Sequence, residues 1–168
     1  TYKAIPIYLH IEIDNYYLML IIEGKNSFSF YRVDRMVKIE ILEENFDLND
    51  YIINNEAFNP VEECAKSFKM HNDGDEIKVK LLIEKWMVSY LLDELGERVK
   101  ITKLETGKYI DEFRAYENDG LVGWILGIGA STKVISPKSL RDMIIEKLDD
   151  ILEEYKNLDF NIYNTIWK

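Results

Sequence analysis

Two β-rich runs joined by a short turn constrain the fold of this chain more than any other sequence feature. The first run extends from Tyr16 to Ile22 and the second from Phe28 to Val33, and both are rich in aromatic and β-branched residues. The five residues between them, Glu-Gly-Lys-Asn-Ser, have the composition of a tight turn. The pattern therefore predicts a β-hairpin near the start of the chain.

The rest of the first 49 residues extends this β character. Apolar residues alternate with others from Ile5 to Ile13, and Val37 to Ile41 alternates as a half-buried strand does. Four or five short strands with tight connections predict a small barrel or a strongly curved sheet over residues 1–49. Closure of the sheet would also hide the edges of these aromatic strands.

Residues 50–75 have the composition of a connector with one short helix. The stretch is rich in Asn and acidic residues, and Asn59-Pro60 followed by acidic residues is typical of a helix N-terminus. We expect that helix to end at about Phe68 and a loop to follow it.

From residue 76 to residue 168 the pattern alternates between strands and helices. The predicted order is strand, helix, strand, strand, helix, strand and a long final helix, which is the ferredoxin-like βαββαβ arrangement. Gly96 and Gly129 stand where helix C-terminal caps belong, and Pro137 opens the final helix. The predicted fold class is thus α+β, with a small β-barrel followed by a ferredoxin-like domain. The corresponding segments are 77–81, 86–95, 99–104, 109–115, 121–128, 134–135 and 137–155.

Composition excludes several classes of protein. The net charge of −10 argues against broad electrostatic binding of nucleic acid. No apolar run approaches the ~20 residues that span a bilayer, and the N-terminus lacks a signal-peptide pattern. Cys64 is the single cysteine, which excludes a disulfide framework and fits a reducing cytoplasm.

Catalytic motifs are absent from the sequence, so we expect neither an enzyme nor a cofactor. His10 and His71 are the only histidines, and they form no zinc-binding pattern with Cys64. The acidic stretch from His71 to Glu76 lacks the spacing of a calcium loop, which favours a plain turn. Gly127-Ile128-Gly129 ends a predicted helix and is not a dinucleotide fingerprint.

The closely spaced Arg32, Asp34 and Arg35 stand out in this acidic chain. One interpretation is an anion site, in which guanidinium groups hold a phosphate or a carboxylate. The other is structural, with the arginines engaged in ion pairs. Residues three apart on a strand face opposite ways, so a shared pocket for Arg32 and Arg35 requires a bulge or a strand end near Asp34.

Two motifs in this region resemble those of WYL domains. Tyr16-Tyr17-Leu18 is similar to the Trp-Tyr-Leu motif, and the run from Tyr31 to Met36 is similar to the Phe-Arg-Leu-Asp-Arg-Ile motif. Tyr16 replaces the tryptophan of the family, and Ser29 stands where a further basic residue is frequent. The remainder resembles the C-terminal extension called WCX, including Trp124-Ile125-Leu126-Gly127 and the run from Val134 to Arg141.

The resemblance implies a C-terminal fragment of a bacterial transcriptional regulator. Its expected parts are an Sm-like or SH3-like barrel, a ferredoxin-like domain and a winged helix-turn-helix absent from this sequence, which would bind DNA. In such regulators the barrel is thought to sense a nucleotide or single-stranded nucleic acid. Carried over by position, Arg32 and Arg35 would contact the anion, Tyr17 would line the pocket and Asp34 would orient an arginine. His10 is a weaker candidate without a motif match.

Two functions therefore remain open. The first is a ligand-sensing and oligomerising module of a regulator, expected to form a homodimer. The second is a purely structural dimerisation module in which internal ion pairs occupy the arginines.

Overall fold

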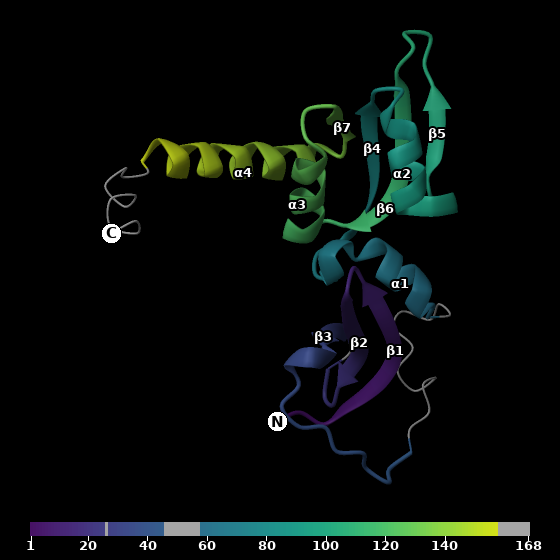
Figure 1. The fold of residues 1–168 in the computed structure, drawn as a ribbon, viewed down its shortest axis with the longest axis vertical. Helices are drawn as coiled ribbons and strands as arrows, with labels where there is room; N and C mark the ends of the chain where they lie inside the picture. Colours follow the sequence, from purple (N-terminus) through teal and green to yellow (C-terminus); the bar gives the residue numbers. More distant parts are fainter. Residues whose placement is uncertain (26, 46–57, 158–168) are drawn as a thin grey trace.

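The first part of the chain is an antiparallel sheet of three strands, in the order β1-β2-β3 (Figure 1). The computed structural model describes residues 1–25, 27–45 and 58–157. The predicted hairpin is confirmed: β2 pairs with β3, and Gly24 supplies a turn residue with φ of 82°. A register shift between Pro6 and Tyr8 interrupts the pairing of β1 with β2. The strands are β1 (Ala4–Glu12), β2 (Asn15–Ile22) and β3 (Phe28–Arg32).

One face of this sheet carries a small core that helix α1 (Pro60–Lys66) helps to close. Met19, Ile21 and Phe28 pack with Cys64 of α1, which brings a residue of the predicted connector into the core. The helix begins as predicted, because the Asn59 side chain accepts a 3.1 Å hydrogen bond from the Val61 amide. The Asn-rich residues 50–57 lie outside the described part of the chain.

The strand predicted for Val37–Ile41 is wrong. Strand β3 ends at Arg32, and a single 3₁₀ turn, η1 (Val33–Arg35), redirects the chain. Beyond it, residues 37–41 pair with no strand in the described regions, and Val37 is fully exposed. The alternating pattern shows that this stretch suits a strand, but a strand also needs a hydrogen-bonding neighbour. Within the described residues the sheet thus has three strands and does not close.

The second part confirms the βαββαβ order. Its four strands form an antiparallel sheet in the order β5-β6-β4-β7, so the first and third strands lie in the middle. Together with the first sheet, this arrangement confirms the α+β class. The elements are β4 (Glu76–Ile83), α2 (Met87–Leu95), β5 (Lys100–Lys103), β6 (Tyr109–Tyr116), α3 (Asp119–Ile128), β7 (Thr132–Ser136) and α4 (Lys138–Lys156).

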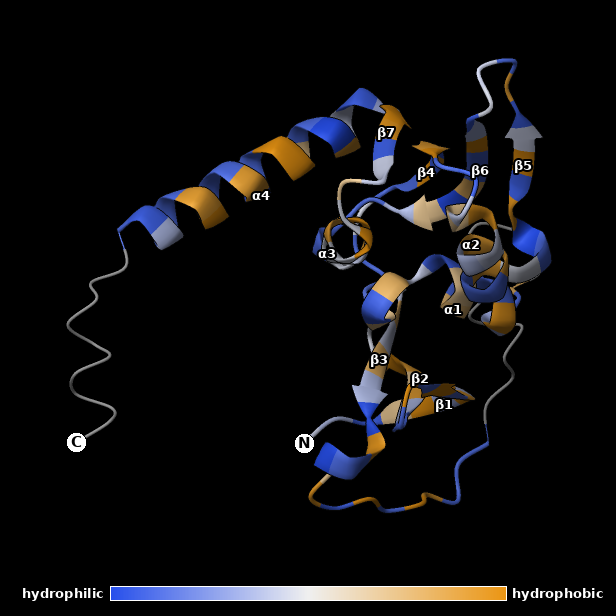
Figure 2. Cartoon of the chain, turned by 45° about the horizontal axis from the view of Figure 1, so that its top comes forward, coloured by the Kyte–Doolittle hydropathy of each residue, from blue (hydrophilic) through white to orange (hydrophobic). Residues whose placement is uncertain are grey.

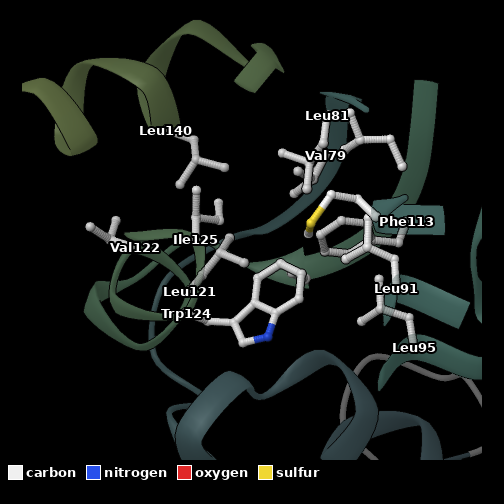
Figure 3. Close-up of a cluster of buried hydrophobic side chains, with 13 residues drawn as sticks. Val79, Leu81, Leu91, Leu95, Phe113, Leu121, Val122, Trp124, Ile125 and Leu140 are labelled. Carbon is white, nitrogen blue, oxygen red and sulfur yellow. The ribbon is translucent and has the colours of Figure 1, made fainter. Parts of the chain in front are cut away.

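Alternation along β4 and β6 divides this sheet into an apolar and a charged face. Val79, Leu81 and Ile83 point into a core shared with α2 and α3, where Trp124 of α3 packs against Phe113 of β6 (Figure 3). Glu112 lies on the opposite face and pairs there with Lys78 at 2.5 Å. The predicted helix ends are also confirmed, with Gly96 and Gly129 at positive φ after α2 and α3.

Helix α4 packs only through its first turns and then extends away from the four-stranded unit (Figures 1 and 2). Leu140 is fully buried, and Met143 and Ile144 pack partly on the core. The remaining apolar side chains of α4 are exposed, so much of its apolar stripe does not cover its own sheet. These exposed residues are Ile145, Leu148, Ile151, Leu152 and Tyr155.

The two sheets are joined through the segment that follows α1. A short 3₁₀ turn, η3 (Phe68–Met70), lies against the start of α3. Two residues later, the Asn72 side chain donates a 2.7 Å hydrogen bond to the Phe28 carbonyl of β3. This segment therefore contacts both the three-stranded sheet and the core of the second unit.

Candidate functional site

Three predicted site residues form one row across the first sheet. His10 on β1 lies opposite Tyr17 on β2, and Tyr17 lies opposite Arg32 on β3. Residues directly opposite one another in a sheet project from the same face. The next row on that face contains Met19, which is fully buried in the small core. The row of His10, Tyr17 and Arg32, called the polar row below, is therefore the half-buried polar margin of that core.

Asp34 orients the guanidinium at one end of the polar row. Arg32 donates from Nε to Asp34 Oδ1 at 3.0 Å and from Nη2 to Asp34 Oδ2 at 2.8 Å. This bidentate pairing raises the pKa of Arg32 and holds the pKa of the Asp34 carboxyl below its usual value. The pairing uses one edge of the guanidinium, and the edge formed by Nη1 and Nη2 keeps donors for a further acceptor.

Arg35 adds a second positive charge beside this pair. The end of β3 at Arg32 provides the strand end that a shared site requires, and Arg35 follows in the 3₁₀ turn η1. Its charge contributes to the lowered pKa of Asp34, and its side chain is exposed. Asp34 thus lies in the field of both arginines, and neither arginine is buried.

The other end of the polar row opens into a cleft of about 580 Å³ between the first sheet and the second unit. His10 lines this cleft, and its Nε2 lies 3.5 Å from Glu12 Oε2. Lys69 and Arg98 contribute basic groups from the opposite side, and the Arg98 side chain donates to the Ala65 carbonyl. A ligand bound at His10 would thus lie within reach of both parts of the chain.

Sequence reasoning missed Lys69 and Arg98. Lys69 belongs to η3, where its φ is 53°, and Arg98 ends the 3₁₀ turn η4 (Gly96–Arg98). Neither residue belongs to a motif, and about thirty positions separate them in the chain. They line one cleft because η3 follows α1 and the Arg98 side chain reaches the Ala65 carbonyl of α1, so no local pattern signals them.

Among the residues that the structure describes, the remaining reactive groups lie apart from one another. Burial raises the pKa of the Cys64 thiol to about 11, which leaves little thiolate at neutral pH. His71 lies 3.8 Å from Asp73 on the surface. No group of three or more His, Cys, Asp or Glu side chains in residues 1–25, 27–45 and 58–157 has an arrangement suited to a metal ion. None of the helices in this part of the chain combines the length and apolar character that crossing a bilayer requires.

The fold and site define an α+β chain in which a small β-sheet with a half-buried polar row precedes a ferredoxin-like unit. Residues 75–152 match the family model of the WCX domain, so this similarity covers the four-stranded unit. The match begins one residue before β4 and ends within α4, so it includes every strand of the second sheet.

Comparisons with whole proteins give a weak structural similarity. No curated protein matches the chain. Among solved structures, proteasome accessory factor B/C (PafBC) of Arthrobacter aurescens aligns with a TM-score of 0.41 and 19% sequence identity. The alignment covers 90% of this chain but 22% of PafBC, so the chain spans about a fifth of that protein's length. A similarity at this score supports no conclusion about fold or function.

Proposed function

We propose that this chain is the ligand-sensing part of a WYL-type transcriptional regulator and is not itself an enzyme. The observation that carries the proposal is the polar row, in which register alone places His10, Tyr17 and Arg32 side by side. The WCX match of the second unit supports it, because the motifs of residues 1–49 resemble the WYL domain that precedes WCX in such regulators.

The chemistry of the row suits a small anion with a flat or ring-shaped portion. Arg32, held by Asp34, offers the Nη1–Nη2 edge to a phosphate or carboxylate, and Arg35 adds charge from η1. Tyr17 provides an aromatic surface beside the guanidinium, and base stacking on such surfaces tolerates any sequence. A nucleotide or a short single strand has both features. Because the chain carries a net charge of −10, binding depends on this local pocket and not on the overall charge.

The proposal is tested by thermal unfolding with inorganic phosphate, the four ribonucleoside monophosphates and a short oligo(dT) strand. A ligand at a hundredfold excess over its dissociation constant stabilises the folded state by roughly 2.7 kcal/mol. Arg32→Ala and Arg35→Ala should lose the shift. Lys25→Ala is the matched control, because Lys25 is exposed in the turn at the other end of the hairpin. The absence of a shift with every probe, or an unchanged shift in both arginine variants, would refute the proposal.

Asp34→Asn separates positioning from simple charge. If Asp34 orients Arg32, the variant binds the same probe more weakly even though it removes a negative charge near an anion. If Asp34 acts only through repulsion, the variant binds more tightly. Titration calorimetry of the wild type and the variant distinguishes the two results.

A second candidate function is a structural module without a ligand. It is favoured by the bidentate contact with Asp34, which already satisfies Nε and Nη2 of Arg32. Under this alternative, Arg32→Ala lowers stability in the absence of any ligand and no probe changes the unfolding temperature. The same thermal experiment therefore decides between the two candidates.

A further inference from the structure

Residues 37–41 form an exposed segment that has the character of a strand but no strand partner among the described residues. Val37 is 103% exposed, Ile39 65% and Ile41 94%. The segment contains no Gly or Pro, and its β-branched residues favour an extended backbone. Figure 2 shows it crossing the side of the three-stranded unit that faces away from the second sheet, with hydrophobic and hydrophilic residues in alternation. Exposed strand-like segments with apolar side chains readily pair with another chain.

The order of side chains in this segment is self-complementary. When two copies run antiparallel and are centred on Ile39, Val37 of one copy lies opposite Ile41 of the other, and Ile39 lies opposite Ile39. In the same register, Lys38 lies opposite Glu40 on both sides of the centre. Each opposing pair is then either apolar with apolar or positive with negative, and both kinds of pair stabilise a ladder.

Charges within one chain agree with this geometry. Lys38 Nζ lies 3.2 Å from Glu40 Oε2, so these two side chains lie side by side just after the bend at Val37. Both are largely exposed, and a pair of this kind adds little to the stability of one chain. In two paired copies the same groups would instead form two contacts between the chains. An antiparallel partner strand needs a negative residue opposite Lys38 and a positive residue opposite Glu40. A second copy of the same segment meets both requirements.

We propose that residues 37–41 pair with the same segment of a second copy of this chain, as an antiparallel ladder with its two-fold axis at Ile39. Such an interface is isologous, because each copy contributes the same surface. It also brings the apolar side chains of the two copies into contact on one face of the ladder. The pairing is independent of the proposed ligand site, so each can fail without the other.

A charge-exchange experiment on the 168-residue chain tests the register. By sedimentation equilibrium, the wild type should dimerise, and Lys38→Glu or Glu40→Lys should each raise the dissociation constant roughly tenfold or more, since like charges then oppose each other twice. An equal mixture of the two variants should recover dimers, as should the double variant Lys38→Glu/Glu40→Lys. Lys25→Glu changes the net charge by the same amount outside the segment and should dimerise like the wild type.

Cysteine cross-linking tests the axis itself. In the proposed register the two Ile39 Cα atoms lie about 4.5–5.5 Å apart, within the range that a disulfide bridges. Ile39→Cys should therefore cross-link to itself under mild oxidation. Val37→Cys is the matched control, because its two copies lie about 13 Å apart and should not cross-link, although Val37→Cys should cross-link with Ile41→Cys. The native Cys64 is buried in the first core and should stay reduced.

Three results would overturn the proposal. The first is a single-chain mass at every concentration tested. The second is a dimer that none of the charge variants weakens, which would place the interface elsewhere, for example on α4. The third is equal self-cross-linking of Ile39→Cys and Val37→Cys, which would show contact without the register.

Discussion

The side-chain amide of Asn72 donates a 2.7 Å hydrogen bond to the main-chain carbonyl of Phe28. Phe28 is buried in the first core, and Asn72 immediately precedes the second unit in the chain. The contact thus ties the segment before β4 to the first sheet at a partly buried position. A buried carbonyl that loses its donor costs about 1–3 kcal/mol.

Asn72→Ala should therefore destabilise the junction between the sheets. We expect a loss of about 1–3 kcal/mol and faster amide exchange in β2 and β3 than in β4 and β6, because the lost contact belongs to the first sheet. Hydrogen exchange with mass spectrometry resolves the two sheets. Asp73→Ala, at an exposed neighbouring position, serves as the control. Equal acceleration in both sheets would contradict a local role for Asn72.

Asp111 makes stability fall as the pH rises. Its carboxylate is fully buried in β6, where a contact with the Glu112 backbone only partly offsets the cost of burying the charge. Burial raises the pKa of Asp111 from 3.8 to about 7. The folded state thus retains a proton that the unfolded state releases, and stability decreases between about pH 4 and pH 7, by up to roughly 4 kcal/mol.

Asp111→Asn should remove this dependence. We expect the variant to exceed the wild type in unfolding temperature at pH 8 and to differ much less at pH 5. Glu112→Gln is a control of opposite sign, since Lys78 and Lys80 lower the pKa of Glu112 to about 2. That variant should lose stability at neutral pH, with the difference from the wild type shrinking in acid below about pH 4. A constant offset for Asp111→Asn at both pH values would contradict the prediction.

Lys66 holds two carboxylates together at the junction of α1 and the second sheet. Its Nζ lies 2.7 Å from Glu63 Oε1 and 2.8 Å from Glu76 Oε2, and the residue is 8% exposed. Lys66→Met leaves both carboxylates without this charge, and removing one member of a buried ion pair costs about 3–5 kcal/mol. Because Glu76 remains partly exposed and also pairs with Arg114, we expect the lower end of that range. Urea unfolding measures the loss.

Lys138→Met is the matched control for Lys66. Lys138 pairs with Asp142 at 2.5 Å, but its side chain is 77% exposed, so its loss should cost well under about 1 kcal/mol. Similar losses in the two variants would show that burial does not govern the Lys66 cluster.

Two glycines of α3 should respond oppositely to alanine. A Cβ at Gly120 would lie 2.3 Å from the Phe68 carbonyl oxygen, whereas a Cβ at Gly127 would meet nothing within 4 Å. Gly120→Ala should therefore destabilise the chain by about 1–3 kcal/mol through displacement of η3. Gly127→Ala should stabilise it by about 0.4–1 kcal/mol, since alanine restricts the unfolded chain and favours helix. Thermal unfolding of the pair checks both signs, and destabilisation by both would contradict the argument.

Local chemistry explains what the sequence could predict. Helix caps depend on residues within a few positions of the helix end, so the sequence alone predicts the ends marked by Asn59, Gly96 and Gly129. The polar row could be predicted in part, because Tyr17 and Arg32 lie in recognisable motifs. Their position opposite each other follows only from the register in which β2 pairs with β3. Lys66 reads as an ordinary surface lysine of a helix, and its burial follows from how α1 packs.

The prediction of a strand for residues 37–41 was wrong because strand formation also depends on residues far away in the chain. Alternation reports the preference of the backbone and side chains, but not whether a neighbouring strand exists. The turn at Val33–Arg35 directs the chain away from the open edge of β3, and no local pattern announces that change of direction.

Helix α4 has a mechanical consequence. Among the described residues it packs through Leu140 and is exposed beyond Ile144, and the helix from Ile144 to Lys156 is about 18 Å long at 1.5 Å per residue. A rigid rod of that length converts a tilt of roughly ten degrees at its base into a displacement of about 3 Å at its tip. A small change of angle where α4 meets the core would thus move the tip of the helix by a distance comparable to the separation of two side chains in contact.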